Sequence, residues 1–192
     1  MATQSIPRVS EEEYLRLDRA AEYKSEFLDG EIFAMSGGSL RHSRLAVSWA
    51  RELDLKLRTK NCHVFSSDAR LRTPVSGSYL YPDVSVVCGT PQTHRESNDI
   101  LTNPSLVIEV LSPSTTGYDR GKKFERYREI PSLRDYILVH ADAPHAEHFA
   151  RQPDTSWVFR DYSGLDSVVP FDSIGCAISL KEVYAGVLEI PG

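Results

Sequence analysis

The sequence predicts a mixed fold of the α/β (α+β) class, in which helices flank a mixed central β-sheet. One segment, from Ser39 to about Leu57, carries apolar residues at spacings of three and four, which is typical of an amphipathic helix. Several extended segments are rich in β-branched residues, and one of them is apolar at almost every position. Such elements bury their apolar faces when helices pack on a sheet. We expect an N-terminal helix and hairpin, a central core and a C-terminal β extension.

Length and composition favour one compact domain. The chain has 192 residues, of which 41% are hydrophobic and 26% are charged, as in ordinary globular proteins. No internal repeat or long linker divides it, so we expect a single domain over residues 1–192 with its core at about 39–142. The net charge of −5 argues against a protein that coats nucleic acid, but it is compatible with an enzyme that has a local basic face.

The cysteines and the N-terminus favour a cytoplasmic protein. Cys62, Cys88 and Cys176 are an odd number at wide spacing, which indicates neither a disulfide framework nor a zinc site. The first residues lack an apolar signal segment, and no stretch reaches the ~18 apolar residues that a membrane span needs. We therefore expect a soluble protein in a reducing cytoplasm, with no membrane partner.

The first two elements are a short helix and a hairpin. Ser10, followed by three glutamates, is typical of a helix N-cap with an acidic first turn. Farther along, Asp29-Gly30 stands between two apolar pairs in the segment 27–33. This dipeptide is a strong signal for a β-hairpin turn.

The clearest helix runs from Ser39 to about Leu57, where the apolar residues form one stripe. The stripe consists of Ala46, Trp49, Ala50, Leu53 and Leu57. The other faces of this helix and the following turn carry more basic than acidic residues, although the chain as a whole has a net negative charge. The basic residues are Arg41, Arg44, Arg51, Lys56, Arg58 and Lys60, against Glu52 and Asp54.

The remaining elements alternate between strands and one more helix. Extended segments are expected at Cys62–Arg72, Tyr79–Cys88 and Leu106–Leu111. A helix is expected from Asp119 to about Glu129, then a strand at 136–139 and a strand pair near 146–152 and 156–161. The segment 180–190 fits a helix and a strand equally well. We expect the aromatic residues of this half in the core rather than in a dimer interface, namely Tyr136, Trp157 and Tyr162.

The most informative residue is Glu109, because it interrupts an apolar run that implies burial on both faces. An ionised carboxylate there needs a metal, a cation or hydrogen-bond donors, and a structural ion pair is as good an explanation as a functional site. Asp83 stands at the mouth of another apolar strand, where a lone aspartate most often caps a turn. Together, two carboxylates at strand ends can converge on one hard divalent cation.

The predicted helix at 119–129 can bring a positive charge to these acids. Asp119, Lys123 and Tyr127 are spaced i, i+4 and i+8 and share one helix face. Taken alone, this spacing also fits a surface salt bridge beside a core tyrosine. Glu26 and His42 are further candidates, although a lone histidine on an apolar stripe is more often a hydrogen-bonded core residue.

These candidates stand in three blocks of sequence. The blocks are Tyr81-Pro82-Asp83-Val84, the run from Leu106 to Ser114, and Asp119-Arg120-Gly121-x-Lys123-x-x-x-Tyr127. In them the chain resembles the Uma family of predicted bacterial restriction endonucleases, an offshoot of the PD-(D/E)XK nuclease superfamily. The segment 26–31 and the helix that carries His42 extend the resemblance over about residues 10–142.

The resemblance implies a restriction-endonuclease-like core in which Asp83 and Glu109 bind the metal. The superfamily's lysine would stand two positions after the acid, where this chain has Leu111. The Uma-like pattern places it on the next helix instead, at Lys123, from which it could stabilise transition-state charge or orient water. We therefore expect an endonuclease that hydrolyses DNA phosphodiester bonds with Mg²⁺ or Mn²⁺. Glu26 would add a metal or outer contact, with His42 and Tyr127 in support.

Several questions stay open at this level. The basic residues Arg41, Arg44, Lys122 and Arg126 are expected to contact DNA phosphates, and a homodimer is plausible for an enzyme that cuts both strands. The alternative is a catalytically weak or inactive module that binds DNA or a partner on a nuclease scaffold, since folds outlive functions. A serine or cysteine hydrolase is poorly supported: there is no Gly-x-Ser-x-Gly motif, and Cys62 and His63 would point to opposite faces of a strand.

Overall fold

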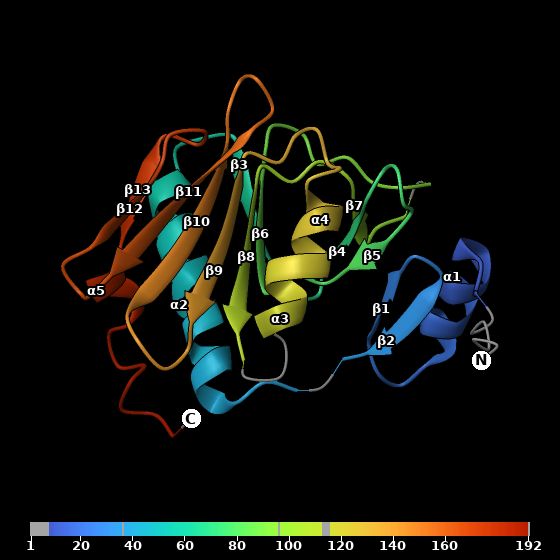
Figure 1. The fold of residues 1–192 in the computed structure, drawn as a ribbon, viewed down its shortest axis with the longest axis horizontal. Coiled ribbons are helices and arrows are strands. Elements are labelled where there is room, and N and C mark those ends of the chain that lie inside the picture. The colour runs from blue at the N-terminus through green and yellow to red at the C-terminus, as the bar shows by residue number, and fades with distance from the viewer. Residues whose placement is uncertain (1–7, 36, 96, 113–115, 192) are drawn as a thin grey trace, which may run out of the picture.

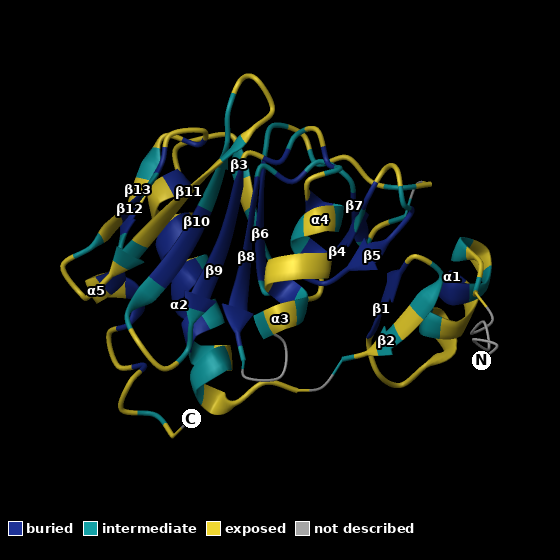
Figure 2. Cartoon of the chain, in the orientation of Figure 1, coloured by how far each residue is buried: buried dark blue, intermediate teal, exposed yellow. Residues whose placement is uncertain are grey.

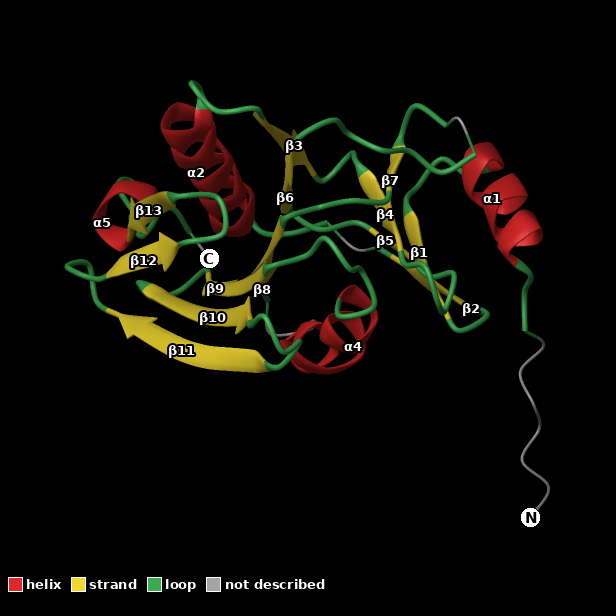
Figure 3. Cartoon of the chain, turned by 90° about the horizontal axis from the view of Figure 1, so that it is seen from above, coloured by secondary structure: helices red, strands yellow, loops and turns green. Residues whose placement is uncertain are grey.

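A computed structural model shows two β-sheets, with helices packed on their outer faces and one helical segment, residues 116–127, between them (Figure 1, Figure 3). It describes residues 8–35, 37–95, 97–112 and 116–191. Residues 113 and 114, which end the second resemblance block, lie outside this range. The helices are α1 (Glu11–Ala20), α2 (Leu40–Leu57), α3 (Thr116–Tyr118), the π-helical turn η1 (Asp119–Lys123), α4 (Phe124–Tyr127) and α5 (Leu180–Val183).

The strands form a six-stranded sheet, a five-stranded sheet and a separate two-stranded ribbon. The larger sheet has the order β11-β10-β9-β8-β6-β3, the smaller one β2-β1-β5-β4-β7, and the ribbon is β12-β13. The bounds are β1 Ser25–Leu28, β2 Glu31–Ala34, β3 Cys62–Ser66, β4 Arg70–Arg72, β5 Tyr79–Leu80, β6 Val84–Cys88, β7 Ile100–Leu101, β8 Leu106–Leu111, β9 Asp135–His140, β10 His145–Arg151, β11 Trp157–Ser163, β12 Val168–Phe171 and β13 Cys176–Ser179.

The larger sheet is mixed, as the sequence predicts. Its central strand β8 pairs antiparallel with β6 and parallel with β9. All six residues of β8 are buried, and the neighbouring strand β9 is buried along most of its length (Figure 2). The continuous apolarity of 106–111 therefore reflects cover on both faces of the sheet, and Glu109 sits in the middle of it.

Different elements cover the two faces of the larger sheet (Figure 3). On one face, the apolar stripe of α2 packs with α5 and the β12-β13 ribbon around Trp49 and Phe171. On the other, Tyr127 and neighbouring residues pack against leucines of the smaller sheet. Tyr136 is fully buried as predicted, whereas Trp157 and Tyr162 are partly buried residues packed at the edges of the two clusters.

The N-terminal prediction is confirmed and extended. Ser10 caps α1 by accepting a hydrogen bond from the backbone N–H of Glu13, and β1 and β2 form the expected hairpin. The hairpin is part of the smaller sheet, because β1 also pairs with β5 at Phe27 and Tyr79. It forms one side of this second sheet, which the sequence did not predict and which α1 covers through Tyr14 stacked on Phe27.

Two predicted strands are wrong as single elements. The segment 62–72 divides into β3 and β4, and the segment 79–88 divides into β5 and β6, with the members of each pair in different sheets. Pro82 lies at the second break, where a residue without an N–H cannot continue a ladder. The three residues Tyr81 to Asp83 thus carry the chain from the smaller sheet to the larger one.

The predicted helix over 119–129 is also corrected. The helical segment begins at Thr116, passes through the π-helical turn η1 and ends at Tyr127. The hydroxyl of Tyr136 donates a hydrogen bond of 2.9 Å to the backbone carbonyl of Asp119, and Gly121 weakens the regular helix at this point. A π-helical turn of this kind often marks a functional site.

The expectation that the cysteines form no disulfide is wrong. Cys62 on β3 and Cys88 on β6 stand opposite each other in the antiparallel ladder and are joined by a disulfide. The two cysteines are 26 residues apart in sequence, so their spacing does not indicate a disulfide. They meet because the chain leaves the larger sheet after β3 and returns to it at β6. Cys176 is a free thiol.

The tail holds two further differences from the prediction. Its strand pair is present as β10 and β11, which extend the larger sheet, but the ribbon of β12 and β13 was not predicted. The undecided segment 180–190 begins as the short helix α5 and continues in turns. No helix in the described part of the chain is long and apolar enough to cross a membrane.

Candidate functional site

Asp83 and Glu109 are brought together by the register of β6 and β8. Val84 pairs with Ile108 in this antiparallel ladder, so its continuation places Asp83 opposite Glu109. The backbone N–H of Val110 donates a hydrogen bond of 2.7 Å to Asp83 Oδ2. The two acids predicted from the sequence therefore stand opposite each other, with Asp83 just before β6 and Glu109 within β8.

Lys123 reaches Glu109 from η1. Its Nζ lies 3.1 Å from Glu109 Oε1 and 3.0 Å from Glu26 Oε1. Asp119, one turn earlier, lies 3.6 Å from the same Nζ. One ammonium group therefore binds carboxylates from β1, β8 and η1.

Three tyrosine residues orient the carboxylates around Lys123. Tyr127 donates a hydrogen bond of 2.8 Å to Glu109 Oε1. Tyr118 donates to Glu26 Oε2 at 3.1 Å, and the backbone N–H of Tyr81 donates to Glu26 Oε1 at 2.9 Å. Glu26 is thereby held at the point where the chain crosses between the sheets.

The cluster is deeply buried and holds three carboxyl groups around one ammonium group. The exposed fractions of Glu26, Glu109, Asp119 and Lys123 are 4%, 3%, 3% and 5%. Burial raises the pKa of Glu109 well above its usual value, and the neighbouring carboxylates add to this effect, while Lys123 opposes it. Burial alone would lower the pKa of Lys123, but Glu109, Glu26 and Asp119 outweigh it and raise that pKa, so the ammonium stays protonated.

His42 is a partner of Asp83 rather than an ordinary core histidine. Its Nε2 lies 3.3 Å from Asp83 Oδ2. Burial lowers the pKa of His42, but the contact with Asp83 outweighs this and raises the pKa above its usual value. A Cβ at Gly38 would meet His42 Nδ1 at 2.7 Å, so the chain before α2 passes close to the imidazole ring because it has no side chain there.

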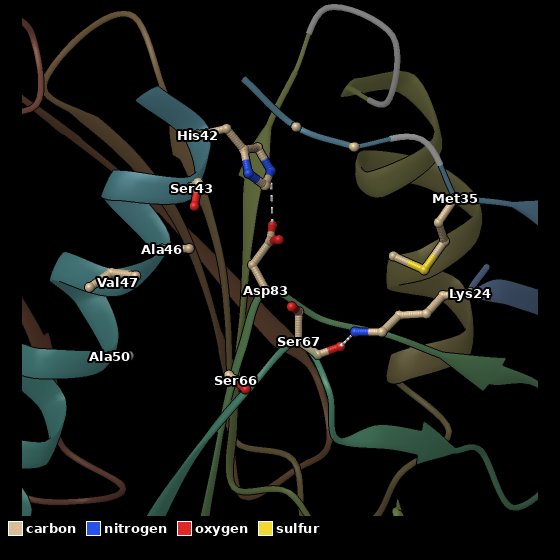
Figure 4. Close-up of a pocket in the computed structure, with 12 residues that line it drawn as sticks. Lys24, Met35, His42, Ser43, Ala46, Val47, Ala50, Ser66, Ser67 and Asp83 are labelled. Atoms are coloured by element: carbon tan, nitrogen blue, oxygen red, sulfur yellow. Dashed lines mark hydrogen bonds and ion pairs between the residues drawn. The ribbon is translucent and has the colours of Figure 1, made fainter. Parts of the chain in front are cut away.

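A cavity of about 450 Å³ opens beside His42 and Asp83 (Figure 4). One wall is α2, with Ser43 and Val47, and the opposite side holds Lys24, whose Nζ donates to the carbonyl of Ser67. Asp83 is thus reachable from this cavity, while Glu109 lies behind it in the buried cluster.

The four predicted phosphate contacts divide into two pairs. Arg41 is engaged with Asp142 and the carbonyl of Ile190, and Arg126 forms ion pairs with Asp29 and Glu129. Among the described residues, Arg44 and Lys122 form no ion pair, and Lys122 Nζ lies 5.7 Å from the ring centroid of Phe33. Of these four residues, Arg41 and Arg126 are therefore held by acidic partners, whereas Arg44 and Lys122 form no ion pair within the described part of the chain.

Sequence reasoning missed two contributors. Tyr118 is the first. Its position directly before Asp119 in the sequence is the one signal that could have indicated its part in the site. Asp119 was recognised as sharing a face with Lys123, yet it was not counted in the site. Its spacing from Lys123 was the available signal, and the close contact between the two confirms it.

Comparison with known proteins gives this geometry a context. Residues 11–181 match the Uma2 family, whose description reads "Putative restriction endonuclease". The match extends over most of the chain. The chain belongs to the Uma2 family.

Relatives of this Uma2 chain include two proteins of Synechocystis sp. The uncharacterized protein sll1609 is 38% identical over 159 residues, which cover 83% of this chain and 90% of the relative. The uncharacterized protein slr1290 is 36% identical over 182 residues, which cover 95% and 94% of the two chains.

A solved structure shares the fold of this Uma2 chain. It is titled as the crystal structure of a putative nuclease belonging to DUF820 from Anabaena variabilis. The TM-score is 0.78 at 19% identity, and the match covers 94% of this chain and 99% of the other. The mixed sheets flanked by helices are therefore a nuclease-like fold, and the family supports a nuclease-like function.

Proposed function

We propose that this protein is a divalent-metal-dependent endonuclease that hydrolyses DNA phosphodiester bonds. The observation that carries the proposal is the placement of Lys123 Nζ 3.1 Å from Glu109, with Asp83 held beside Glu109 by the backbone of Val110. Two neighbouring carboxylates and one lysine are the groups that the resemblance to PD-(D/E)XK nucleases implies. Here they come from β8, the β5–β6 crossing and η1.

The donor chemistry fits Mg²⁺ or Mn²⁺. Asp83, Glu109 and Glu26 offer carboxylate oxygens, which hard divalent cations prefer. The buried cluster contains the three acids Glu26, Glu109 and Asp119 around the single ammonium of Lys123. With all three ionised, the cluster would have an excess of negative charge, which a bound cation would balance. When bound, such an ion polarises a phosphoryl oxygen and lowers the pKa of the attacking water.

The side chains of this chain have separate roles in the proposed reaction. Asp83 and Glu109 would hold the ion, and Glu26 would add a contact. Lys123 remains protonated and binds the negative charge that develops on the phosphate, or orients the water. His42 and Tyr127 position Asp83 and Glu109, respectively.

One observation favours the alternative of an inactive binding module. Glu109 is 3% exposed, and its Oε1 is already occupied by Lys123 and Tyr127. A closed ion-pair cluster of this kind can stabilise the fold without taking part in catalysis. The module would bind DNA in a salt-sensitive manner and would form no metal-dependent product.

The test is cleavage of supercoiled and linear DNA by the wild type and by Asp83→Ala, each with Mg²⁺, Mn²⁺ or EDTA. Asp54→Ala, an exposed acid of α2, is the matched control. Cleavage that needs metal, disappears in Asp83→Ala and persists in Asp54→Ala supports the endonuclease. If the folded wild type cleaves no substrate, including RNA, while it binds DNA, the binding module becomes the better proposal.

Assembly and compartment belong to the same proposal. We propose a homodimer, because two centres allow both strands to be cut, and sedimentation of the purified chain at several concentrations tests it. We propose the cytoplasm as the compartment. Trapping the thiols in intact cells tests this, since a cytoplasmic chain would keep Cys62 and Cys88 largely reduced.

A further inference from the structure

A second cluster of metal-binding side chains lies at the turn between β9 and β10. His140 ends β9, and His145 and Glu147 lie on β10. Each offers one donor atom, and these three atoms lie within 4.8 Å of one another. His140 Nε2 is 3.0 Å from Glu147 Oε1, and the two imidazole rings are stacked with their centroids 4.2 Å apart.

The hairpin register explains why these residues meet. Ala146 pairs with Val139, so His145 stands opposite His140. Residues two apart on a strand share a face, which places Glu147 on the same side as both histidines. Asp161 on β11 pairs with Glu147, and its Oδ1 lies 2.5 Å from His145 Nε2.

The cluster is distinct from the candidate nuclease site. Glu109 pairs with Leu138, and Leu138 pairs with Glu147, so the buried Leu138 stands between the two acids in one row across the sheet. Two strand spacings separate Glu109 from Glu147, which is about 10 Å. The two groups therefore cannot share one ion, although η1 contacts both, through Lys123 on one side and Arg120 on the other.

We propose that His140, His145 and Glu147 form a second metal site, for a borderline cation of the Zn²⁺ type. Two imidazoles with one carboxylate are ligands that suit Zn²⁺, whereas Mg²⁺ prefers oxygen donors throughout. Asp161 contacts Nε2 of His145. Carboxylates commonly bind the ring nitrogen of a histidine that does not ligate the metal, so Nδ1 of His145 would be the ligand atom. The site would be structural, because it joins the end of β9 to β10 and needs no DNA.

Arg120 competes with the metal for Glu147. Its guanidinium forms an ion pair with both carboxylate oxygens of Glu147, and its Nη2 also lies 3.4 Å from His140 Nε2. A divalent ion must displace at least part of this contact. The competition predicts that removal of the guanidinium strengthens metal binding, which a purely structural ion pair would not predict.

The test is a titration of the metal-free full chain with Zn²⁺ by calorimetry and with Co²⁺ by visible absorption, in the absence of DNA. We expect one ion per chain to bind at His140, His145 and Glu147 at micromolar concentration or below. His145→Ala should weaken binding by at least about 100-fold, since even the loss of a residue behind a ligand costs about 10- to 100-fold. His63→Ala, at an exposed histidine on β3, should bind as the wild type does, and Asp83→Ala tests whether the ion lies in the candidate nuclease site instead.

Arg120→Met provides the second arm, and it is expected to bind Zn²⁺ more tightly than the wild type. The proposal is overturned if the folded wild type binds no Zn²⁺, if His145→Ala binds it unchanged, or if Asp83→Ala rather than His145→Ala abolishes binding. None of these readouts depends on DNA cleavage. The proposal of a second metal site can therefore be refuted while the endonuclease proposal is retained, and the endonuclease proposal can be refuted while the second site is retained.

Discussion

Asp83 Oδ2 accepts a hydrogen bond of 2.7 Å from the backbone N–H of Val110, the residue that follows Glu109. The contact ties the crossing between the two sheets to the central strand. Asp83 thus has a structural role as well as its proposed role as a metal ligand. Any experiment on this residue has to separate the two.

Asp83→Asn and Asp83→Ala separate them. The asparagine retains an oxygen that can accept from Val110, so its stability should stay close to that of the wild type. The alanine leaves a buried N–H without a partner and should lower the free energy of unfolding by about 1–3 kcal/mol. Urea unfolding measures the difference. If both variants abolish metal-dependent cleavage but only Asp83→Ala is destabilised, the charge of Asp83 serves the chemistry.

Lys123→Met should be strongly destabilising in EDTA. It leaves Glu26 and Glu109 buried without their shared cation, and removal of one partner from a buried ion pair costs about 3–5 kcal/mol. Combining it with Glu109→Gln removes one of the unpaired charges and should restore part of the stability. Urea unfolding of both variants provides the check. A loss below about 1 kcal/mol for Lys123→Met would show that the acids are hydrated rather than buried.

Reduction of the Cys62–Cys88 disulfide should destabilise the chain. Opening a cross-link over 26 residues costs about 2–4 kcal/mol, because the unfolded chain gains freedom. Cys62→Ser should show this loss with and without reductant, whereas Cys176→Ser, which alters the free thiol, should still respond to reductant. Unfolding midpoints measured with and without reductant test the prediction. An unchanged midpoint in reduced wild type would contradict it.

Acid should weaken the attachment of α1 to the smaller sheet. A hydrogen bond from Arg72 is the main cause that lowers the pKa of Glu11 to about 2 from a usual value of 4.5. Because the folded pKa is depressed, the stabilisation is present above about pH 4.5 and is lost as the pH falls towards 2. Glu11→Gln should reduce the dependence of the free energy of unfolding on pH in this range. Glu22→Gln, at an exposed glutamate just after α1, should leave that dependence unchanged. Denaturant midpoints between pH 5 and 2 give the comparison.

Arg44 and Lys122 should contribute more to DNA binding than Arg41 and Arg126. Each phosphate contact that is removed lowers the slope of log affinity against log salt by about one. We expect this for Arg44→Ala and Lys122→Ala, while Arg41→Ala should chiefly loosen the C-terminal segment that it holds through Ile190. Fluorescence anisotropy over a range of salt concentrations measures the slopes. Equal slopes for all variants would exclude these residues as phosphate contacts.

The part of the fold that follows local rules could be predicted from the sequence. The cap of α1, the Asp29-Gly30 hairpin and the apolar stripe of α2 each depend on residues close in sequence. The second sheet could not be predicted in this way. Its strands β4, β5 and β7 have only two or three residues each, so they are too short to show a period, and their pairing depends on contacts across the chain.

The same distinction applies to the candidate site. Asp83, Glu109 and Lys123 were identified because a charged residue in or beside an apolar strand is costly and because their blocks resemble a family. The disulfide and the contact of His42 with Asp83 depend on how distant segments meet. The role of each site residue and the core boundary at about 39–142 stay predictions that only experiments on the protein can test.

The crossing of the chain between its two sheets has a consequence for how the protein acquires its proposed activity. Glu26 and Tyr118, which share a hydrogen bond in the site, are 92 residues apart in sequence, and contacts between such distant residues form only after long loops close. Glu26 therefore meets Lys123 and Glu109 only when both sheets have formed and docked. A partly synthesised or partly unfolded chain lacks the complete set of ligands, so the proposed cutting of DNA would begin only with the finished fold.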